Sequence, residues 1–159
     1  MKANRERWHL FIKPEDDANR QLANGFVESL SFLAQTKVQI DRPAGGYLKA
    51  LEFVADAQLE RFPERRLLIL IDFDKSADIR KRIVERYSSV NNRIFVLGAK
   101  PEAEDLRREL KCHLCECGAK IADSCEDSGC AIWAIDSLRH NEKSLSRLCP
   151  EIYRELIKT

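Results

Sequence analysis

Several features that would assign the chain to a broad class are missing from its sequence. No apolar run approaches the roughly 20 residues that a membrane-spanning helix needs, so we expect no membrane contact. Lysine and arginine number 27 against 26 aspartates and glutamates, so the overall charge gives no reason to expect a polyanionic partner, although a local patch is compatible with one. There is also no internal repeat, low-complexity tract or linker. Residues 1–159 are therefore predicted to form a single domain with a buried core.

The first residues carry no secretion signal. MKANRERWHLFIKPEDD begins with basic residues, but it lacks the apolar region and the small-residue cleavage site that such a signal needs. We therefore expect a cytoplasmic protein. In that reducing compartment the six cysteines are expected to be free thiols or metal ligands rather than disulfides.

Short apolar runs alternate with segments of helical periodicity along most of the chain. The runs predicted to be strands are WHLFIK (8–13), KVQI (37–40), LLILI (67–71) and RIFVL (93–97). Apolar residues at helical spacing predict four helices, with expected core residues Leu22, Phe26, Leu30 and Leu33, then Leu48, Leu51, Ala55, Leu59 and Phe62, then Ile79, Ile83 and Tyr87, and finally Ala103, Leu106 and Leu110. Asp16 or Asp17 would cap the first helix and Pro63 would close the second.

The alternation of these elements predicts the fold class. LLILI is apolar on both faces, as expected of a central parallel strand with helices on each side. The element lengths suit right-handed βαβ crossovers, so we expect an α/β fold of three layers, with a mostly parallel sheet of four to five strands and helices on both faces. AIWAI (131–135) is compatible with a strand or with part of a helix. A final helix is expected over 144–158, with Pro150 bending it or delaying its start.

Acidic residues follow the first and third predicted strands. Asp72 and Asp74 end the run LLILIDFD, and Glu15, Asp16 and Asp17 follow the first strand. The carboxyl ends of parallel strands meet at one edge of a sheet, where these groups would repel one another unless protons or a cation compensated. Mg²⁺ or Mn²⁺ is the expected cation, since both favour carboxylate oxygens. Alternatively, the acids are helix caps and solvated loop charges.

This arrangement resembles the Toprim domain of topoisomerases, primases and OLD-type nucleases. The likeness covers about residues 8–98 and rests mainly on IDFD (71–74), with support from FIKPEDDA (11–18). In that family, a glutamate after the first strand is a general acid or base, and an Asp-x-Asp pair binds Mg²⁺ during phosphodiester cleavage or transfer. The resemblance implies catalytic roles for Glu15, Asp72 and Asp74. It implies Mg²⁺ ligands among the same three residues and Asp17.

The first motif departs from the family pattern. Lys13-Pro14 stands where the family has Glu-Gly, and Asp17-Ala18 follows as Asp-Ala does in the family. Glu15 takes the glutamate's role only if the turn directs it inward. Lys13 itself would hold a phosphate, or it marks a domain that keeps the fold without the chemistry. Lys13, Lys75 and His140 are the residues expected to contact nucleic acid.

The strand ends also resemble response-regulator receivers. EDDANRQL (15–22) is similar to a receiver's acidic pair and first helix, and FVLGAKPEAEDLRREL (95–110) to its fourth strand and following helix. That likeness implies a phosphorylatable Asp72 beside Mg²⁺ held by Glu15 or Asp16. Against it, Gly98 stands where a receiver has Ser or Thr, and Asp74 has no receiver role.

Segment 112–130 contains five of the six cysteines. Cys112 and Cys115, followed by Cys125 and Cys130, have a spacing similar to that of structural Zn²⁺ ligands. The segment also has the pattern of a thiol-rich helix with Leu114, Ile121, Ala122 and Cys125 on one face. A redox pair at Cys112 and Cys115 is a third interpretation.

Downstream, LRHNEKSLSRL (138–148) is a basic amphipathic stretch in which His140 is a phosphate contact or general base, or His140-Asn141 simply caps the helix. The leading hypothesis is a Mg²⁺-dependent domain that cleaves or binds nucleic acid. The alternatives are a receiver-like phosphoacceptor and a non-catalytic interaction module. The resemblance to defence-type systems implies a protein partner such as an ATPase for such a module.

Overall fold

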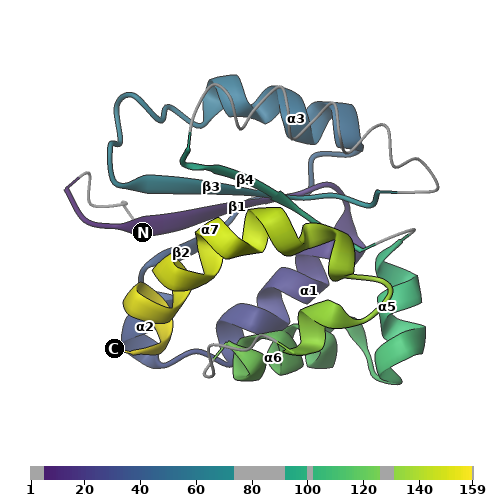
Figure 1. The fold of residues 1–159 in the computed structure, drawn as a ribbon. Coiled ribbons are helices and arrows are strands. Elements are labelled where there is room, and N and C mark those ends of the chain that lie inside the picture. Colours follow the sequence, from purple (N-terminus) through teal and green to yellow (C-terminus); the bar gives the residue numbers. More distant parts are fainter. Residues whose placement is uncertain (1–5, 74–91, 100–101, 126–130, 159) are drawn as a thin grey trace.

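The computed structural model describes residues 6–73, 92–99, 102–125 and 131–158 (Figure 1). Its strands are β1 (His9–Pro14), β2 (Val38–Ile40), β3 (Arg65–Leu70) and β4 (Ile94–Leu97). They form one sheet in the order β2-β1-β3-β4, and every neighbouring pair is parallel. The predicted parallel α/β sheet is therefore confirmed, with four strands in the described part of the chain.

Helices cover both faces of this sheet. The α-helices are α1 (Asp17–Glu28), α2 (Phe32–Gln35), α3 (Tyr47–Asp56), α5 (Ala103–Leu110), α6 (Leu114–Ser124) and α7 (Glu142–Ile152). Figure 1 shows α3 on one side of the sheet and α1, α6 and α7 on the other, which makes three layers. The helix predicted around Ile79, Ile83 and Tyr87 lies outside the described residues.

Strand β3 is buried on both faces, as its continuous apolar run predicted. Leu68 and Leu70 pack into the core on the side of α1 and α7, whereas Leu67 and Ile69 pack into the core beneath α3. All four side chains are buried. Alternate side chains of a strand point to opposite faces, so one run of leucines and isoleucines contributes to both cores.

Two leucines that were expected in the core are exposed. The first helix ends at Glu28, and a new short helix, α2, begins after Ser31, so the periodicity that starts at Leu22 does not extend to Leu33. Leu33 is 66% exposed. In α3 the buried stripe passes through Ala50 and Leu51. Leu48, at 59% exposed, and Ala55, which was also expected in the core, lie off it.

The second helix also ends earlier than Pro63. It stops at Asp56, because Ala57 is its C-cap and Gln58 adopts a left-handed conformation with φ of 53°. Leu59 is nevertheless buried, from the loop that leads into β3.

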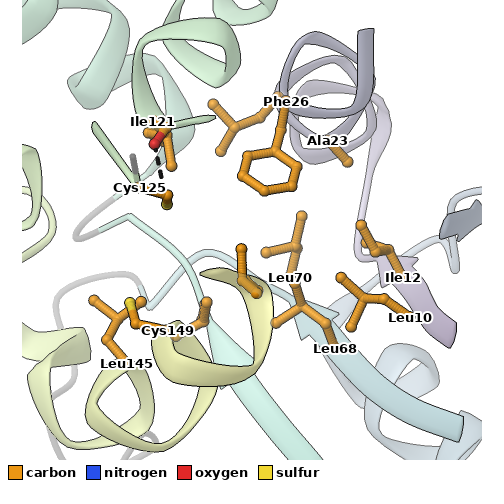
Figure 2. Close-up of a pocket in the computed structure, with 13 residues that line it drawn as sticks. Leu10, Ile12, Ala23, Phe26, Leu68, Leu70, Ile121, Cys125, Leu145 and Cys149 are labelled. Atoms are coloured by element: carbon orange, nitrogen blue, oxygen red, sulfur yellow. Dashed lines mark hydrogen bonds between the residues drawn. The ribbon is translucent and has the colours of Figure 1, made fainter. Parts of the chain in front are cut away.

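The described residues from 131 to 158 are mostly helical. Segment 131–135 begins as a 3₁₀ helix, η1 (Ala131–Ala134), and a second 3₁₀ turn, η2 (Arg139–Asn141), leads into α7. Helix α7 runs through Pro150 and continues as a π-helix, η3 (Tyr153–Ile157), so the proline does not delay its start. Between α1, α6, α7 and the sheet lies a cavity of about 60 Å³ lined by apolar side chains (Figure 2).

Glycines allow α1 and α6 to cross at very short distance. A Cβ atom on Gly118 of α6 would lie 2.1 Å from the Leu22 carbonyl oxygen, and one on Gly25 of α1 would lie 1.9 Å from the Cys115 carbonyl oxygen. Both positions are therefore restricted to glycine by backbone contact between the helices. This crossing holds α1, and the acidic turn that precedes it, against the rest of that layer.

We predict that Gly118→Ala destabilises the protein by about 1–3 kcal/mol, because the added methyl group must push α1 and α6 apart. Helix propensity alone predicts the opposite sign, since alanine is favoured over glycine by about 1 kcal/mol in a helix interior. Denaturant unfolding measures the difference. Lys120→Ala, at an exposed position of the same helix, is the matched control and should change the free energy of unfolding by less than about 0.5 kcal/mol. Equal stability of Gly118→Ala and wild type would contradict the close crossing.

Candidate functional site

The acidic residues gather where the strand order reverses. Strand β1 pairs with β2 on one side and with β3 on the other, so the crevice beyond the carboxyl ends of β1 and β3 is the topological switch point of the sheet. Glu15 and Asp16 follow β1 directly, and Asp72 follows β3. All three are half-buried. Ligands of open α/β sheets bind at this position.

Glu15 turns inward to the end of β3. Its carboxylate oxygen Oε2 accepts a hydrogen bond of 2.7 Å from the backbone N–H of Asp72. The backbone N–H of Glu15 itself donates to the carbonyl oxygen of Leu70 at 2.8 Å. The turn after β1 therefore places Glu15 beside Asp72, which is the orientation on which its predicted role depends.

The Asp72 carboxylate joins β3 to two helices. Its Oδ1 atom accepts from the backbone N–H of Ala103 at 3.0 Å and from the side-chain amide of Asn19 at 3.2 Å. Ala103 is the first residue of α5, so Asp72 lies at the positive end of that helix dipole. Asn19 belongs to the first turn of α1. One carboxylate thus connects β3, α1 and α5.

The pKa of Asp72 is raised to about 7, chiefly by burial and in addition by the negative charges of Asp16 and Glu15. The hydrogen bonds from Asn19 and from the Ala103 N–H act in the opposite direction. Near neutral pH, the Asp72 charge is therefore costly unless a positive ligand accompanies it.

Asp16 caps α1, as one of the two N-cap predictions stated. Its Oδ1 atom accepts from the backbone N–H and from the side-chain amide of Asn19, both at 2.9 Å. Asn19 is completely buried and bridges the Asp16 and Asp72 carboxylates. Its own Oδ1 atom is buried without a hydrogen-bond partner in the described chain. Sequence reasoning missed Asn19, although its position three residues after an N-cap aspartate was a usable signal.

Asp17, the other residue predicted after β1, points to solvent. Its carboxylate accepts from Gln21 Nε2 at 2.8 Å and pairs with Arg20 at 2.8 Å, and these contacts lower its pKa. The structure therefore does not bring Asp17 to Asp72. Asp74 and Lys75 lie outside the described residues.

Lys13 is buried on the opposite side of β1 from Ile12. Its ammonium donates to Asp41 Oδ2 at 2.9 Å and to the Arg42 carbonyl oxygen at 3.0 Å, and lies 4.6 Å from the centre of the Phe53 ring. Its side chain is 8% exposed. This setting gives Lys13 a structural ion pair beside α3 and does not present it to a nucleic-acid phosphate.

Asn141 secures the end of β4 next to the acidic residues. Its side chain accepts from the Gly98 N–H at 3.1 Å and donates to the carbonyl oxygens of Gly98 and Leu138, each at 2.9 Å. A Cβ atom on Gly98 would lie 1.6 Å from the carbonyl oxygen of Ile71, so the backbone of β4 needs glycine there. Asn141 precedes α7, but its side chain does not cap that helix. The side chain of His140 is not among the described parts, so its predicted contact stays a prediction.

Two of the cysteines predicted to bind zinc, Cys115 and Cys125, lie far apart in the structure. Segment 114–124 is a helix, as the alternative interpretation predicted, and Cys115 and Cys125 lie ten residues apart on it. That separation is about 15 Å along the axis, whereas Zn–S bonds are about 2.3 Å long. Cys125 faces the apolar cavity and donates to the Ile121 carbonyl oxygen (Figure 2). Cys130 lies outside the described residues.

Magnesium fits the acidic residues in chemical kind. Within the described ranges, no three histidine, cysteine, aspartate or glutamate side chains are grouped closely enough to form a metal site by themselves. Mg²⁺, however, is typically bound through one or two carboxylates and several waters. Glu15 and Asp72 supply carboxylates at neighbouring strand ends, which the hydrogen bond from the Asp72 N–H to the Glu15 carboxylate links.

Comparison of the chain with protein-family models, curated proteins and solved structures finds no match. None of the helices in the described ranges has the length and apolar character to cross a membrane.

We predict that Asp72→Asn stabilises the protein at pH 8 in the absence of divalent cations. The Asp72 pKa is about 7 in the folded chain and 3.8 when unperturbed, so the stability contributed by this group is present below pH 3.8 and is lost as pH rises through 7. Asparagine keeps the Oδ1 acceptor and removes the charge. Discounted for partial exposure, the gain in free energy of unfolding is about 1–2 kcal/mol at pH 8.

Denaturant unfolding between pH 4 and pH 8 measures this gain, which should shrink as pH falls. Asp123→Asn, at an exposed position of α6, is the matched control for removal of one carboxylate. Identical pH profiles for wild type and Asp72→Asn would show that Asp72 ionises at no cost.

Proposed function

We propose that the chain is a Mg²⁺- or Mn²⁺-dependent domain that acts on the phosphodiester groups of nucleic acid at Glu15 and Asp72. The observation that carries this proposal is the hydrogen bond from the Asp72 N–H to the Glu15 carboxylate, which joins the two acids at the switch point of the sheet. Two adjacent carboxylates that strand topology brings together, one with a raised pKa, are typical of a catalytic or cation-binding site.

Glu15 supports the Toprim resemblance at the position where the sequence departs from it. Lys13 occupies the expected glutamate position but is buried against Asp41 on the other face of β1. Glu15 reaches Asp72 from two residues further along the chain. In this proposal Glu15 takes over the family glutamate's part as proton donor or acceptor, and Lys13 has a structural part only.

The Asp72 carboxylate would hold the cation together with Glu15 and Asp74. When bound, the cation would neutralise these acids and polarise a phosphate oxygen. Asn19 and the Ala103 N–H hold Asp72 Oδ1 in a fixed orientation, so the carboxylate is positioned before any ligand arrives.

The direct test is cleavage of single- and double-stranded DNA and RNA with Mg²⁺ or Mn²⁺. We predict metal-dependent cleavage by wild type and at least a roughly 100-fold lower rate for Glu15→Gln, because general acid–base groups contribute 10²–10⁴-fold. Asp72→Asn should show no metal-dependent cleavage. Asp123→Asn should be unaffected.

Asp17→Asn tests whether Asp17 belongs to the metal site, as the sequence suggested, or lies outside it, as the structure indicates. The structure directs Asp17 to Arg20 and Gln21, so this variant should keep full activity. Activity lost in Asp17→Asn but kept in Glu15→Gln would contradict the assignment of Glu15.

A receiver-like phosphoacceptor is the second candidate. It is favoured by the convergence of Glu15 and Asp16 on one aspartate, Asp72, and by the strand order, which matches the first four strands of flavodoxin-like doubly wound sheets. Acetyl phosphate in the presence of Mg²⁺ would then label Asp72, and Asp72→Asn would remove the label. If the chain neither cleaves nucleic acid nor accepts phosphate, the interaction module with a protein partner such as an ATPase becomes the leading hypothesis.

A further inference from the structure

Two cysteines are in contact at the joint between α5 and α6. Lys111 ends α5 with a left-handed conformation, φ of 54°, and the chain turns directly into α6. Across this turn, Cys112 Sγ and Cys117 Sγ lie 3.0 Å apart. The pair was not expected from the sequence, where Cys115 was the partner considered for Cys112.

The simplest account of this contact is structural. With His113 as the N-cap of α6, Cys112 and Cys117 occupy the N′ and N4 positions. Apolar side chains at these two positions commonly pack together and fix the direction in which the chain enters a helix. Two thiols can serve that purpose, so contact alone does not indicate chemistry.

The two thiols differ in burial, and packing alone does not require such a difference. Cys117 is completely buried. Burial, as the main cause, and the hydrogen bond with Cys112, as the second, raise the pKa of Cys117 to about 12 and keep it a neutral thiol. Cys112 is half-exposed. Reactive cysteines are found in partly exposed, electropositive settings, whereas buried ones are inert.

Cys112 opens onto such a setting. It lines a surface hollow of about 740 Å³, whose other lining residues are Glu104, Arg107, Arg108, Lys111, His113 and Glu116. Three of these residues carry a positive charge and two a negative charge at neutral pH, so the hollow favours anions. Its volume lies within the range of small-molecule pockets, about 300–1,000 Å³.

We propose that Cys112 and Cys117 form a redox-active dithiol that exchanges with the low-molecular-weight disulfide of an anionic thiol. Cys112 is the attacking sulfur, because it is the one that reaches the basic hollow. Cys117 is the resolving sulfur, because it is buried in contact with Cys112.

The exchange proceeds in two displacements. The Cys112 thiolate attacks one sulfur of the small disulfide, whose S–S bond breaks and releases one small thiolate, leaving a mixed disulfide on Cys112. Cys117 then loses its proton to solvent and attacks Cys112 Sγ, which releases the second small thiolate and closes the Cys112–Cys117 bond. The two protein thiols are oxidised, and one small disulfide is reduced to two thiols. Conversion of Cys112 to a disulfide also removes the hydrogen bond that helps to keep Cys117 protonated.

The experiment treats the folded protein with mixtures of oxidised and reduced glutathione and blocks the remaining thiols with an alkylating reagent. Cleavage after Glu116 separates Cys117 from Cys112 and Cys115, and fragmentation of the linked peptides in the mass spectrometer shows which of these two is joined to Cys117. We expect a Cys112–Cys117 link that grows with the ratio of oxidised to reduced glutathione and is reversed by reduced glutathione. Cys115 should carry the alkyl label.

Three variants complete the test. Cys115→Ser should form the same link as wild type. Cys117→Ser should accumulate the glutathione mixed disulfide on Cys112, and Cys112→Ser should leave Cys117 unmodified. A link between Cys112 and Cys115 would overturn the proposal. So would full alkylation of Cys112 and Cys117 at every glutathione ratio, which would leave the pair as a contact that only directs the start of α6.

Discussion

The Asp72 carboxylate is the point on which the arrangement of the acidic site depends. It follows the buried strand β3, accepts from the first N–H of α5, and is held by Asn19 from α1. Its own backbone N–H is bonded to Glu15, from the turn after β1. Four elements thus meet at one residue, and their relative positions are determined by hydrogen bonds to a group whose charge is unfavourable where it lies.

The negative charge of Asp72 is unfavourable in this environment unless it is compensated. Glu15 and Asp16 add to the negative potential around Asp72, and burial removes the water that would screen it. Lys13, on β1, cannot serve as the counter-ion, because its ammonium donates to the Asp41 carboxylate and to the Arg42 carbonyl oxygen. A helix N-terminus and one amide offset part of the cost. In our proposal a proton or a divalent cation supplies the rest, and the choice between them sets the pH range in which the site would work.

The fold was predictable because its signals are local. The apolar residues of β3 alternate between the two cores, as the apolar run predicts. The N-cap at Asp16 follows from the chemistry of its side chain and the few residues after it. Most errors arose where a helix ended early, whereas Leu48 lies within α3 but off its buried stripe. Leu33 was expected to continue the periodicity of α1, but the chain had already begun a new helix after Ser31. Cap residues and a left-handed Gln58 decided those ends, and apolar spacing does not report them.

The location of the candidate site was predictable from the sequence, but only some of its residues were. Strand ends in a parallel sheet converge, so Glu15 and Asp72 were expected at one edge, and the structure brings them together. The direction of each side chain within the turn was not predictable: Glu15 points inward to Asp72, whereas Asp17 points to solvent. Lys13, by contrast, shares the α3 side of β1 with Phe11, as strand alternation predicts. Asn19 was missed because its bond to Asp72 spans 53 residues and depends on the packing of α1.

The most direct measurement is an NMR titration of the Asp72 carboxyl carbon, assigned by its loss in Asp72→Asn, with and without Mg²⁺. Without the cation, the account predicts that Asp72 titrates near pH 7 in the folded protein. With Mg²⁺ bound, its titration should move to clearly lower pH, because the cation stabilises the charged form. Titration of Asp72 near 3.8 without the cation, or a midpoint that Mg²⁺ leaves unchanged, would contradict the account.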